Sequence, residues 1–303
     1  FSIIFFFFIS FLFLDAIIQF SFKKNLFGYT EEINNRISSF FNGRFVLGSY
    51  ISKITLLSLI LLNIFLPFKK FKLFYMVVIF VSVFIVLISG DRASLGLYLL
   101  SLITILVLID KKYISYYQKA LSLILILIFT FSLVYSIDSF KKRFFFQTLS
   151  DVKRADKIFY FSRGHQSHWQ TSYKMFRDNK VFGKGPNMFR FYCDLQKFNS
   201  GEKSCSTHPH NYHIQLLSET GLIGYFLFLF VFLSLIFILI KQFYFVYFKR
   251  KSLLSFNKII ILSLSFSNFW PIITTGNIFS SFTLNLVFIS LGFYFLDEKK
   301  YYK

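Results

Sequence analysis

The feature that most constrains this chain is a series of unbroken apolar runs, each about as long as a bilayer is thick. Helices of soluble domains carry apolar residues on one face only, so runs apolar on all sides indicate a lipid environment. In lipid every backbone polar group must be paired within the protein, and the runs lack the polar–apolar alternation of membrane β-barrel strands. The sequence therefore predicts an all-α polytopic membrane protein.

About eight transmembrane helices are expected, and they divide the chain into three regions. The expected spans are 1–22, 45–67, 72–89, 93–109, 119–137, 214–240, 256–274 and 279–296. We expect N-terminal helices over 1–137, one large loop over 138–213, and C-terminal helices over 214–303. Because the first residue is Phe rather than Met, further helices are expected upstream.

The short connections between the expected spans indicate their orientation. Lys and Arg gather at 69–72, 111–119, 241–251 and 299–303. Positive charge in short loops marks the cytoplasmic side, whereas long loops cross the membrane largely regardless of charge. The loop 138–213 is therefore expected on the opposite side.

The chain is strongly apolar, with a mean hydropathy of +0.58, and yet carries a formal charge of +20. This charge can be interpreted in several ways. Nucleic-acid-binding domains are rarely this apolar, and a chain rich in Phe, Ile and Leu is not disordered. The large loop alone holds 14 Lys and Arg against six Asp and Glu. This excess fits a solvated face, contact with anionic lipid headgroups, or an anion site for a phosphate or pyrophosphate. Arginine forks suit such an anion best, and the candidates are Arg163, Arg177 and Arg190.

All five His and both Cys of the chain lie in the large loop. The stretch 166–179 reads as an amphipathic helix with Trp169, Tyr173, Phe176 and Met175 on one face. Gly183, Gly185 and Pro186 then predict a turn. Outside the cytoplasm Cys193 and Cys205 favour a disulfide, and the alternative is two unpaired buried thiols.

The sharpest local signal is the run from Thr207 to His213, with histidines at 208, 210 and 213. A histidine beside a basic loop can act as a general base near neutral pH. The alternatives are histidines that pack at the membrane interface, or a zinc site formed by all three.

Ionisable and polar groups at the ends of apolar segments are further candidates. Arg92 lies in a tight turn, where it is either functional or simply solvated. Asp15 and Gln19 lie one turn apart in the first span and either line a cavity or pair with a neighbouring helix. Gln215 and Glu219 share a helix face below the histidines, and the nearby Gly221 and Gly224 allow close helix packing.

Three stretches resemble the O-antigen ligase and polymerase family of bacterial inner-membrane glycosyltransferases. The stretches are His208-Pro209-His210-Asn211-Tyr212 with Gln215 and Glu219-Thr220-Gly221, then Arg163 and Trp169 with 175–179 and 182–186, and the turn Ser89-Gly90-Asp91-Arg92. Weaker likeness surrounds Asp15, Gln19, Arg36 and 47–50.

The resemblance implies a GT-C-like fold and a metal-independent glycosyltransferase with no cofactor. The enzyme would move a glycan from undecaprenyl pyrophosphate to an acceptor hydroxyl on the periplasmic face of the inner membrane. It implies His210 as the base, with His208 as second choice, and Arg92, Arg163 and Arg190 at the pyrophosphate. The expected supporting residues are Trp169, Asn211, Gln215, Glu219 and Asp15.

The expected partners are the lipid-linked glycan donor, a glycan or lipid acceptor, membrane lipids, and a chain-length regulator or other polysaccharide-assembly proteins, but no nucleic acid. The run 175–179 and the cysteine pair favour the polymerase branch over the ligase branch. The alternative from another class is a non-enzymatic flippase for lipid-linked glycans. A transporter should place polar residues at mid-membrane and show inverted repeats, whereas here the ionisable residues cluster in one outer loop.

Overall fold

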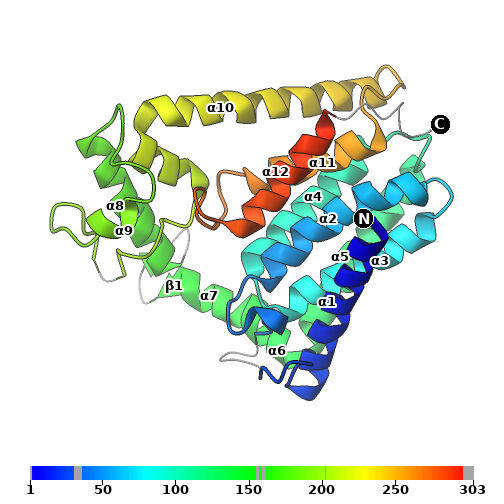
Figure 1. Cartoon of the computed structure of the whole chain (residues 1–303), viewed down its shortest axis with the longest axis horizontal. Coiled ribbons are helices and arrows are strands. Elements are labelled where there is room, and N and C mark those ends of the chain that lie inside the picture. The colour runs from blue at the N-terminus through cyan, green and yellow to red at the C-terminus, as the bar shows by residue number, and fades with distance from the viewer. Residues whose placement is uncertain (1, 31–35, 155–156, 159–161, 202, 296–303) are drawn as a thin grey trace. The chain divides into compact units, whose positions relative to one another are not determined.

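The structure is a computed structural model that describes residues 2–30, 36–154, 157–158, 162–201 and 203–295. The chain forms two compact units. Unit 1 comprises Phe1–Phe144, Ile238–Ser267 and Asn285–Lys303, and unit 2 comprises Phe145–Phe237 and Asn268–Leu284. Helices make up most of the described residues (Figure 1).

Unit 1 is built from apolar helices joined by short connections. Its elements are α1 (Ser2–Phe22), the 3-10 turn η1 (Ser39–Phe41), α2 (Leu47–Phe65), α3 (Lys72–Ile88), α4 (Arg92–Leu108), α5 (Tyr116–Ser136), α6 (Asp138–Phe140), α11 (Phe256–Asn268) and most of α12 (Phe282–Tyr294). The central helix is α2, which is buried along most of its length and packs against α1, α3 and α4. At the start of α5, Ser115 and Gln118 form a capping box that satisfies two exposed backbone donors.

Unit 2 contains the shorter elements and the start of the longest helix. After the π-helical turn η2 (Lys141–Phe146), its elements are α7 (Gln147–Val152), β1 (Lys153–Arg154), β2 (Lys157–Ile158), α8 (Arg163–Asp178), α9 (Phe189–Tyr192) and the first part of α10 (Tyr212–Tyr247). The two short strands pair antiparallel, with Lys153 opposite Ile158. This pair is a small exception, within the described residues, to the expected all-α fold.

Each of the eight expected spans coincides with a helix, but the helices differ in length. Within the described residues, α2, α5 and α10 are long and apolar enough to cross a membrane. The apolar helices α3 and α4 have 17 residues, and α11 and α12 have 13. The helical, membrane-like character is therefore confirmed, and the number of eight spans stays a prediction.

Asp15 organises the segment that follows α1. Its carboxylate is fully buried. It accepts hydrogen bonds from the backbone N–H of Leu26 at 3.0 Å, from the Asn25 amide at 3.2 Å and from the Ser39 hydroxyl. These contacts tie Asn25, Leu26 and Ser39 to α1 and give Asp15 a structural role in unit 1.

Gln19 lies one turn further along α1 and completes this network. Its amide donates to the backbone carbonyls of Tyr29 and Thr30, and its carbonyl accepts the N–H of Ser39 at 2.6 Å. Asp15 and Gln19 therefore pair with neighbouring chain rather than face a cavity.

Replacing Asp15 by Ala should destabilise the protein, because three donors lose a buried acceptor. We expect the free energy of unfolding to fall by roughly 2–4 kcal/mol. The change is measured as a lower apparent Tm of the detergent-solubilised protein, scored by size-exclusion chromatography after heating. Asp138 is exposed at the start of α6, and Asp138→Ala is the control expected to match the wild type. Equal Tm values for the two variants would contradict the structural role of Asp15.

Candidate functional site in unit 2

Helix α8 supplies one wall of the site, and its buried face differs from the expected one. The buried residues are Ser167, His168, Thr171, Ser172 and Met175, which recur at helical spacing. Tyr173, expected on the packed face, is 53% exposed. The helix and the inward position of Met175 are confirmed, but the predicted position of Tyr173 is wrong, and small polar residues pack inward beside Met175.

Four imidazoles gather between α8 and the segment before α10. His165 and His168 lie on α8, and their ring centroids are 5.0 and 5.4 Å from that of His210. The ring of His208 is closer still, at 4.0 Å from His210. The two candidate bases are therefore neighbours, and two histidines of α8 join them.

The segment that carries His208 and His210 is held by backbone contacts. Residue 210 has a left-handed backbone with φ of 58°, and its carbonyl accepts the N–H of Thr275 at 2.8 Å. Asn211 then caps α10, because its side chain accepts the N–H of Ile214. The amide of Asn211 also donates to the carbonyls of Pro271 and Ile273. The expected supporting residue Asn211 thus fixes the loop that presents His210.

Burial and mutual repulsion keep three of these imidazoles, those of His168, His208 and His210, neutral. Desolvation lowers the pKa of His168 and of His208 to about 4, and that of His210 to about 3. The neighbouring histidines lower the pKa of His210 further. Near pH 7 each of these rings therefore has a nitrogen lone pair that can accept a proton or bind a metal ion.

His213 is separate from this cluster. Its Nε2 lies 2.8 Å from the carbonyl oxygen of Phe269, and its Nδ1 lies 3.3 Å from the hydroxyl of Tyr225. The ring also packs against Phe228 and Phe232. The alternative in which residues 208, 210 and 213 converge on zinc is therefore wrong, since the first turn of α10 points His213 into an aromatic pocket.

Glu219 is the buried anchor of the site. Its carboxylate accepts the backbone N–H of Phe189 at 2.8 Å and that of Asn187 at 3.1 Å. The amide of Gln215 donates to it at 3.0 Å, as their shared helix face predicts, and also donates to Asn277. Glu219 thus holds the start of α9 against α10.

A backbone clasp joins residues 180–185 to residues 218–223 of α10. The N–H groups of 184 and 185 donate to the carbonyls of 218 and 219, and those of 222 and 223 donate to the carbonyls of 180 and 181. Helix α10 breaks within this clasp, where Gly221 has φ of 65° and ψ of −161°. Gly221 was expected to thin a continuous helix, and instead it interrupts the helix so that a second segment can bond to it.

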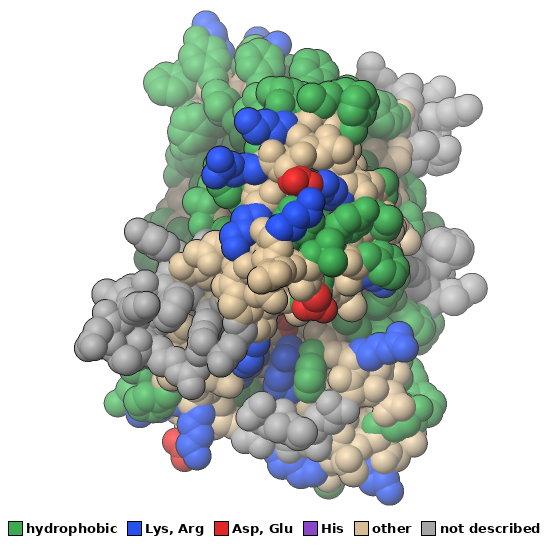
Figure 2. Space-filling view, turned by 90° about the vertical axis from the view of Figure 1, so that its left-hand side faces the viewer, with side chains coloured by type: hydrophobic (Ala, Val, Ile, Leu, Met, Phe, Trp, Pro, Cys, Tyr) green, Lys and Arg blue, Asp and Glu red, His purple; other side chains and the backbone are tan. Residues whose placement is uncertain are grey.

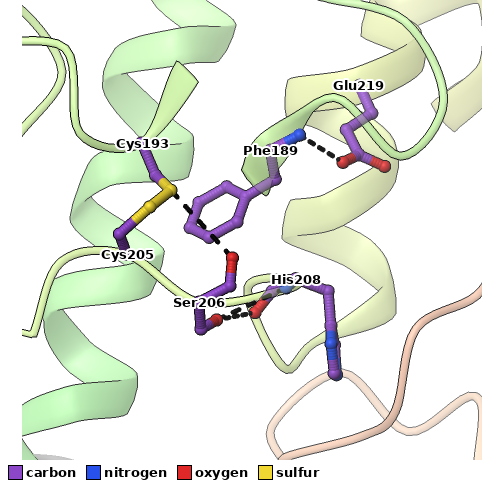
Figure 3. The surroundings of a disulfide bond; sticks show 6 residues. All are labelled: Phe189, Cys193, Cys205, Ser206, His208 and Glu219. Carbon is purple, nitrogen blue, oxygen red and sulfur yellow. Dashed lines mark hydrogen bonds between the residues drawn. A yellow bond between two sulfur atoms is a disulfide. The ribbon is translucent and has the colours of Figure 1, made fainter. Parts of the chain in front are cut away.

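The disulfide lies in the small core of unit 2. Cys193 and Cys205 are bonded, with their Cα atoms 5.0 Å apart. Met175, Phe189, Cys193 and Phe198 form the buried cluster around it. Figure 3 shows the Phe189 ring beside the disulfide and its backbone nitrogen bonded to Glu219. The disulfide and Glu219 thus fix the two ends of the same short helix, α9.

The predicted arginines are distributed over both units. Arg190 lies on α9 with an exposed side chain, and its charge contributes to the lowered pKa of His208. Arg163 is the first residue of α8, and its side chain lies outside the described residues, whereas the Trp169 indole nitrogen is buried. Arg92 lies in unit 1 and opens α4, directly after the N-cap residue Asp91.

Two further arginines border the turn before Arg92. The Nε of Arg143 donates to the carbonyl of Gly90 at 2.9 Å, and that of Arg36 lies 3.4 Å from the carbonyl of Ser89. Gly90 has φ of 65°, and a Cβ there would lie 3.0 Å from the Arg36 side chain. Sequence reasoning did not single out Arg143, because only the fold brings it to this turn.

Basic side chains predominate on the exposed surface of unit 2. The exposed basic residues between α8 and the histidines are Lys174, Arg177, Arg190, Lys197 and Lys203, together with Lys180 at the end of α8. Figure 2 shows Lys and Arg outnumbering Asp and Glu on the side of the molecule where α8 and α9 lie. Of the acidic residues, Asp178 pairs with Lys184 and Lys197. Such a surface attracts anionic ligands.

A family model described as O-antigen ligase matches residues 77–229, half of the chain. The chain belongs to the O-antigen ligase family. The matched region includes Arg92, α8, the four clustered histidines and Glu219. No curated protein and no solved structure matches the chain. Members of the O-antigen ligase family are integral membrane proteins, in agreement with the long apolar helices described here.

Sequence reasoning missed the contribution of His165 and His168 to the histidine cluster. Their spacing of three residues places them on one face of a helix, and this signal was present in the sequence. Their approach to His210, more than forty residues later, depends on the clasp and the disulfide and has no local signature.

Gly183→Ala should disrupt unit 2. Gly183 has φ of 67°, and a Cβ there would lie 2.5 Å from the backbone carbon of Glu219. Left-handed strain and overpacking together should cost roughly 2–4 kcal/mol of stability. Resistance of the solubilised protein to proteolysis measures this change. Gly164, at the start of α8, has open space where a Cβ would stand, so Gly164→Ala provides the control. Equal resistance in the two variants would contradict the clasp.

Proposed function

We propose that this member of the O-antigen ligase family is a metal-independent glycosyltransferase that acts on a lipid-linked glycan. The donor is a glycan on undecaprenyl pyrophosphate, and the acceptor is a hydroxyl of a second glycan or lipid. Transfer takes place on the periplasmic face of the bacterial inner membrane, where unit 2 lies. The polymerase reaction is favoured over the ligase reaction.

The observation that carries the proposal is the position of His210 within the family region. Its imidazole is half-buried, neutral and fixed by the backbone of residues 208–211. A neutral imidazole can accept the proton of the attacking hydroxyl as its oxygen forms the new bond to the anomeric carbon. His208, with its ring 4.0 Å away, is the second candidate.

The leaving group requires positive charge, because the broken bond leaves its electron pair on the pyrophosphate oxygen. Arginine is suited to this task because its planar fork binds two phosphate oxygens. Arg92, Arg163 and Arg190 are the proposed pyrophosphate ligands. The presence of Arg36 and Arg143 at the turn before Arg92 supports an anion site in unit 1. An anion bound by Arg163 or Arg190, which lie in the same unit as His210, would also raise the pKa of His210 and strengthen it as a base.

The proposed base and pyrophosphate ligand are tested by substitution. His210→Ala should abolish polymer formation, and His210→Asn should do the same while retaining a residue that tolerates the left-handed backbone. Arg92→Ala should also abolish it, whereas the exposed Arg44→Ala should not. Banding of surface polysaccharide on gels measures the product, and immunoblots measure protein in the membrane. Normal banding with His210→Asn would refute the base.

The products that accumulate on deletion of the gene separate the related functions. One repeat unit on the final acceptor identifies a polymerase, because transfer still occurs without extension. Accumulated lipid-linked polymer identifies a ligase. Lipid-linked repeat units confined to the cytoplasmic leaflet would instead indicate a flippase and contradict the proposed transferase.

The proposed placement of unit 2 predicts where introduced cysteines react in intact spheroplasts. Lys203→Cys, on the exposed surface of unit 2, should be labelled by a membrane-impermeant maleimide, whereas Lys111→Cys, between α4 and α5, should react only after lysis. The native Cys193–Cys205 pair should remain unlabelled until it is reduced. If Lys111→Cys alone were labelled in intact spheroplasts, the orientation in the membrane would be opposite to the proposed one.

A further inference from the structure

Three histidine nitrogens from two separate segments converge in unit 2. His165 and His168 come from α8, and His210 comes from the segment before α10. One ring nitrogen of each lies within 4.8 Å of the other two. We propose that these three residues bind a divalent transition-metal ion such as Zn²⁺, and that the bound ion inhibits the enzyme. The inhibitory part rests on the proposed function of His210.

The spacing is close to that of a metal site. Zinc bonds to imidazole nitrogens at about 2.0–2.1 Å, which places two nitrogens of a tetrahedral site about 3.3 Å apart. Three nitrogens up to 4.8 Å apart therefore need to move inward by less than about 1 Å each. Small rotations of the rings supply such a movement without a change in the backbone.

The chemistry of the donors selects the type of metal. Three neutral imidazoles suit zinc, copper and nickel, whereas magnesium and calcium prefer carboxylate and carbonyl oxygens. Ligation uses the lone pair of a neutral imidazole, the form that predominates near pH 7 for an ordinary histidine. Three protein ligands leave a fourth position for water or for His208.

Buried nitrogens without partners give a second reason for a ligand. Nδ1 of His168 and Nε2 of His208 are buried and make no hydrogen bond among the described residues. Leaving such atoms unpaired is unfavourable. Ligation would satisfy the first, while His208 is oriented by the Thr207 hydroxyl, 2.9 Å from its Nδ1.

Metal binding and proton transfer compete for the same electrons. When the lone pair of His210 bonds to the metal, that nitrogen no longer accepts the proton of the acceptor hydroxyl. Zinc should therefore slow glycan transfer, and chelation should restore it.

Zinc binding is measured on the full chain, purified in detergent with a tag that lacks histidine and stripped with a chelator. Isothermal titration calorimetry with ZnCl₂ should give a stoichiometry of one zinc ion per chain. The double variant His165→Gln, His168→Gln should bind more than about 100-fold more weakly. His213→Gln is the matched control, because His213 lies outside the cluster, and it should bind as the wild type does. No binding by the wild type, or equal binding by the double variant, would overturn the site.

Cobalt provides a readout that a misfolded variant does not mimic. In the variant His165→Cys, a thiolate ligand should add a sulfur-to-cobalt charge-transfer band to the spectrum of the Co²⁺-loaded protein. Absence of that band in a variant with a wild-type size-exclusion profile would exclude His165 as a ligand.

The inhibitory role is tested on the same proteins, and each protein is assayed with and without zinc. Polymer formation by the wild type and by His213→Gln should fall when zinc is added, and the fractional inhibition should follow the calorimetric occupancy. Full activity of the zinc-loaded wild type would overturn the inhibition but leave the metal site standing. Loss of function in His210→Asn is scored without metal, so failure of the base and failure of the metal site are distinguishable.

Discussion

The arrangement of unit 2 depends on the clasp between residues 180–185 and the broken start of α10. A helix that breaks at Gly221 leaves backbone groups unpaired, and the clasp pairs them with a second segment of chain. The carboxylate of Glu219 connects the clasp to the start of α9, because it accepts the backbone N–H groups of Asn187 and Phe189. Glycine at positions 183 and 221 allows the clasp to form, because a side chain at either position would collide with the opposing backbone.

The clasp helps to position the clustered histidines but takes no part in the proposed chemistry. By fixing α9 it places Phe189 in the cluster with Met175 of α8, and the disulfide joins the same cluster to the segment before the histidines. The four imidazoles are therefore presented by two elements that share one small core. A reactive group held by buried neighbours needs little reorganisation when substrate binds. This explains why a catalytic candidate lies on a loop without being free to move.

The sequence predicted those features that depend on local pattern. Apolar run length located all eight helices, and spacing placed Gln215 beside Glu219. It failed where distant segments decide the outcome. Tyr173 was assigned to the packed face of α8, but its side chain is exposed, and Thr171, Ser172 and Met175 are fully buried instead. The grouping of His165 with His210 likewise needed the fold, because no periodicity relates residues on different elements.

The break in α10 also bears on the depth at which this helix enters the bilayer. Hydrocarbon tolerates irregular backbone only where protein covers it, so residues 218–223 are confined to the membrane surface or beneath residues 180–185. The regular helix that remains, 224–247, is about 36 Å long at 1.5 Å per residue, enough to cross a hydrocarbon core of about 30 Å. The part of α10 that follows the break is therefore long enough to cross the bilayer without the residues before the break. The histidines precede the break in the chain, and the proposed transfer from a lipid-linked donor requires them at the level of the lipid headgroups.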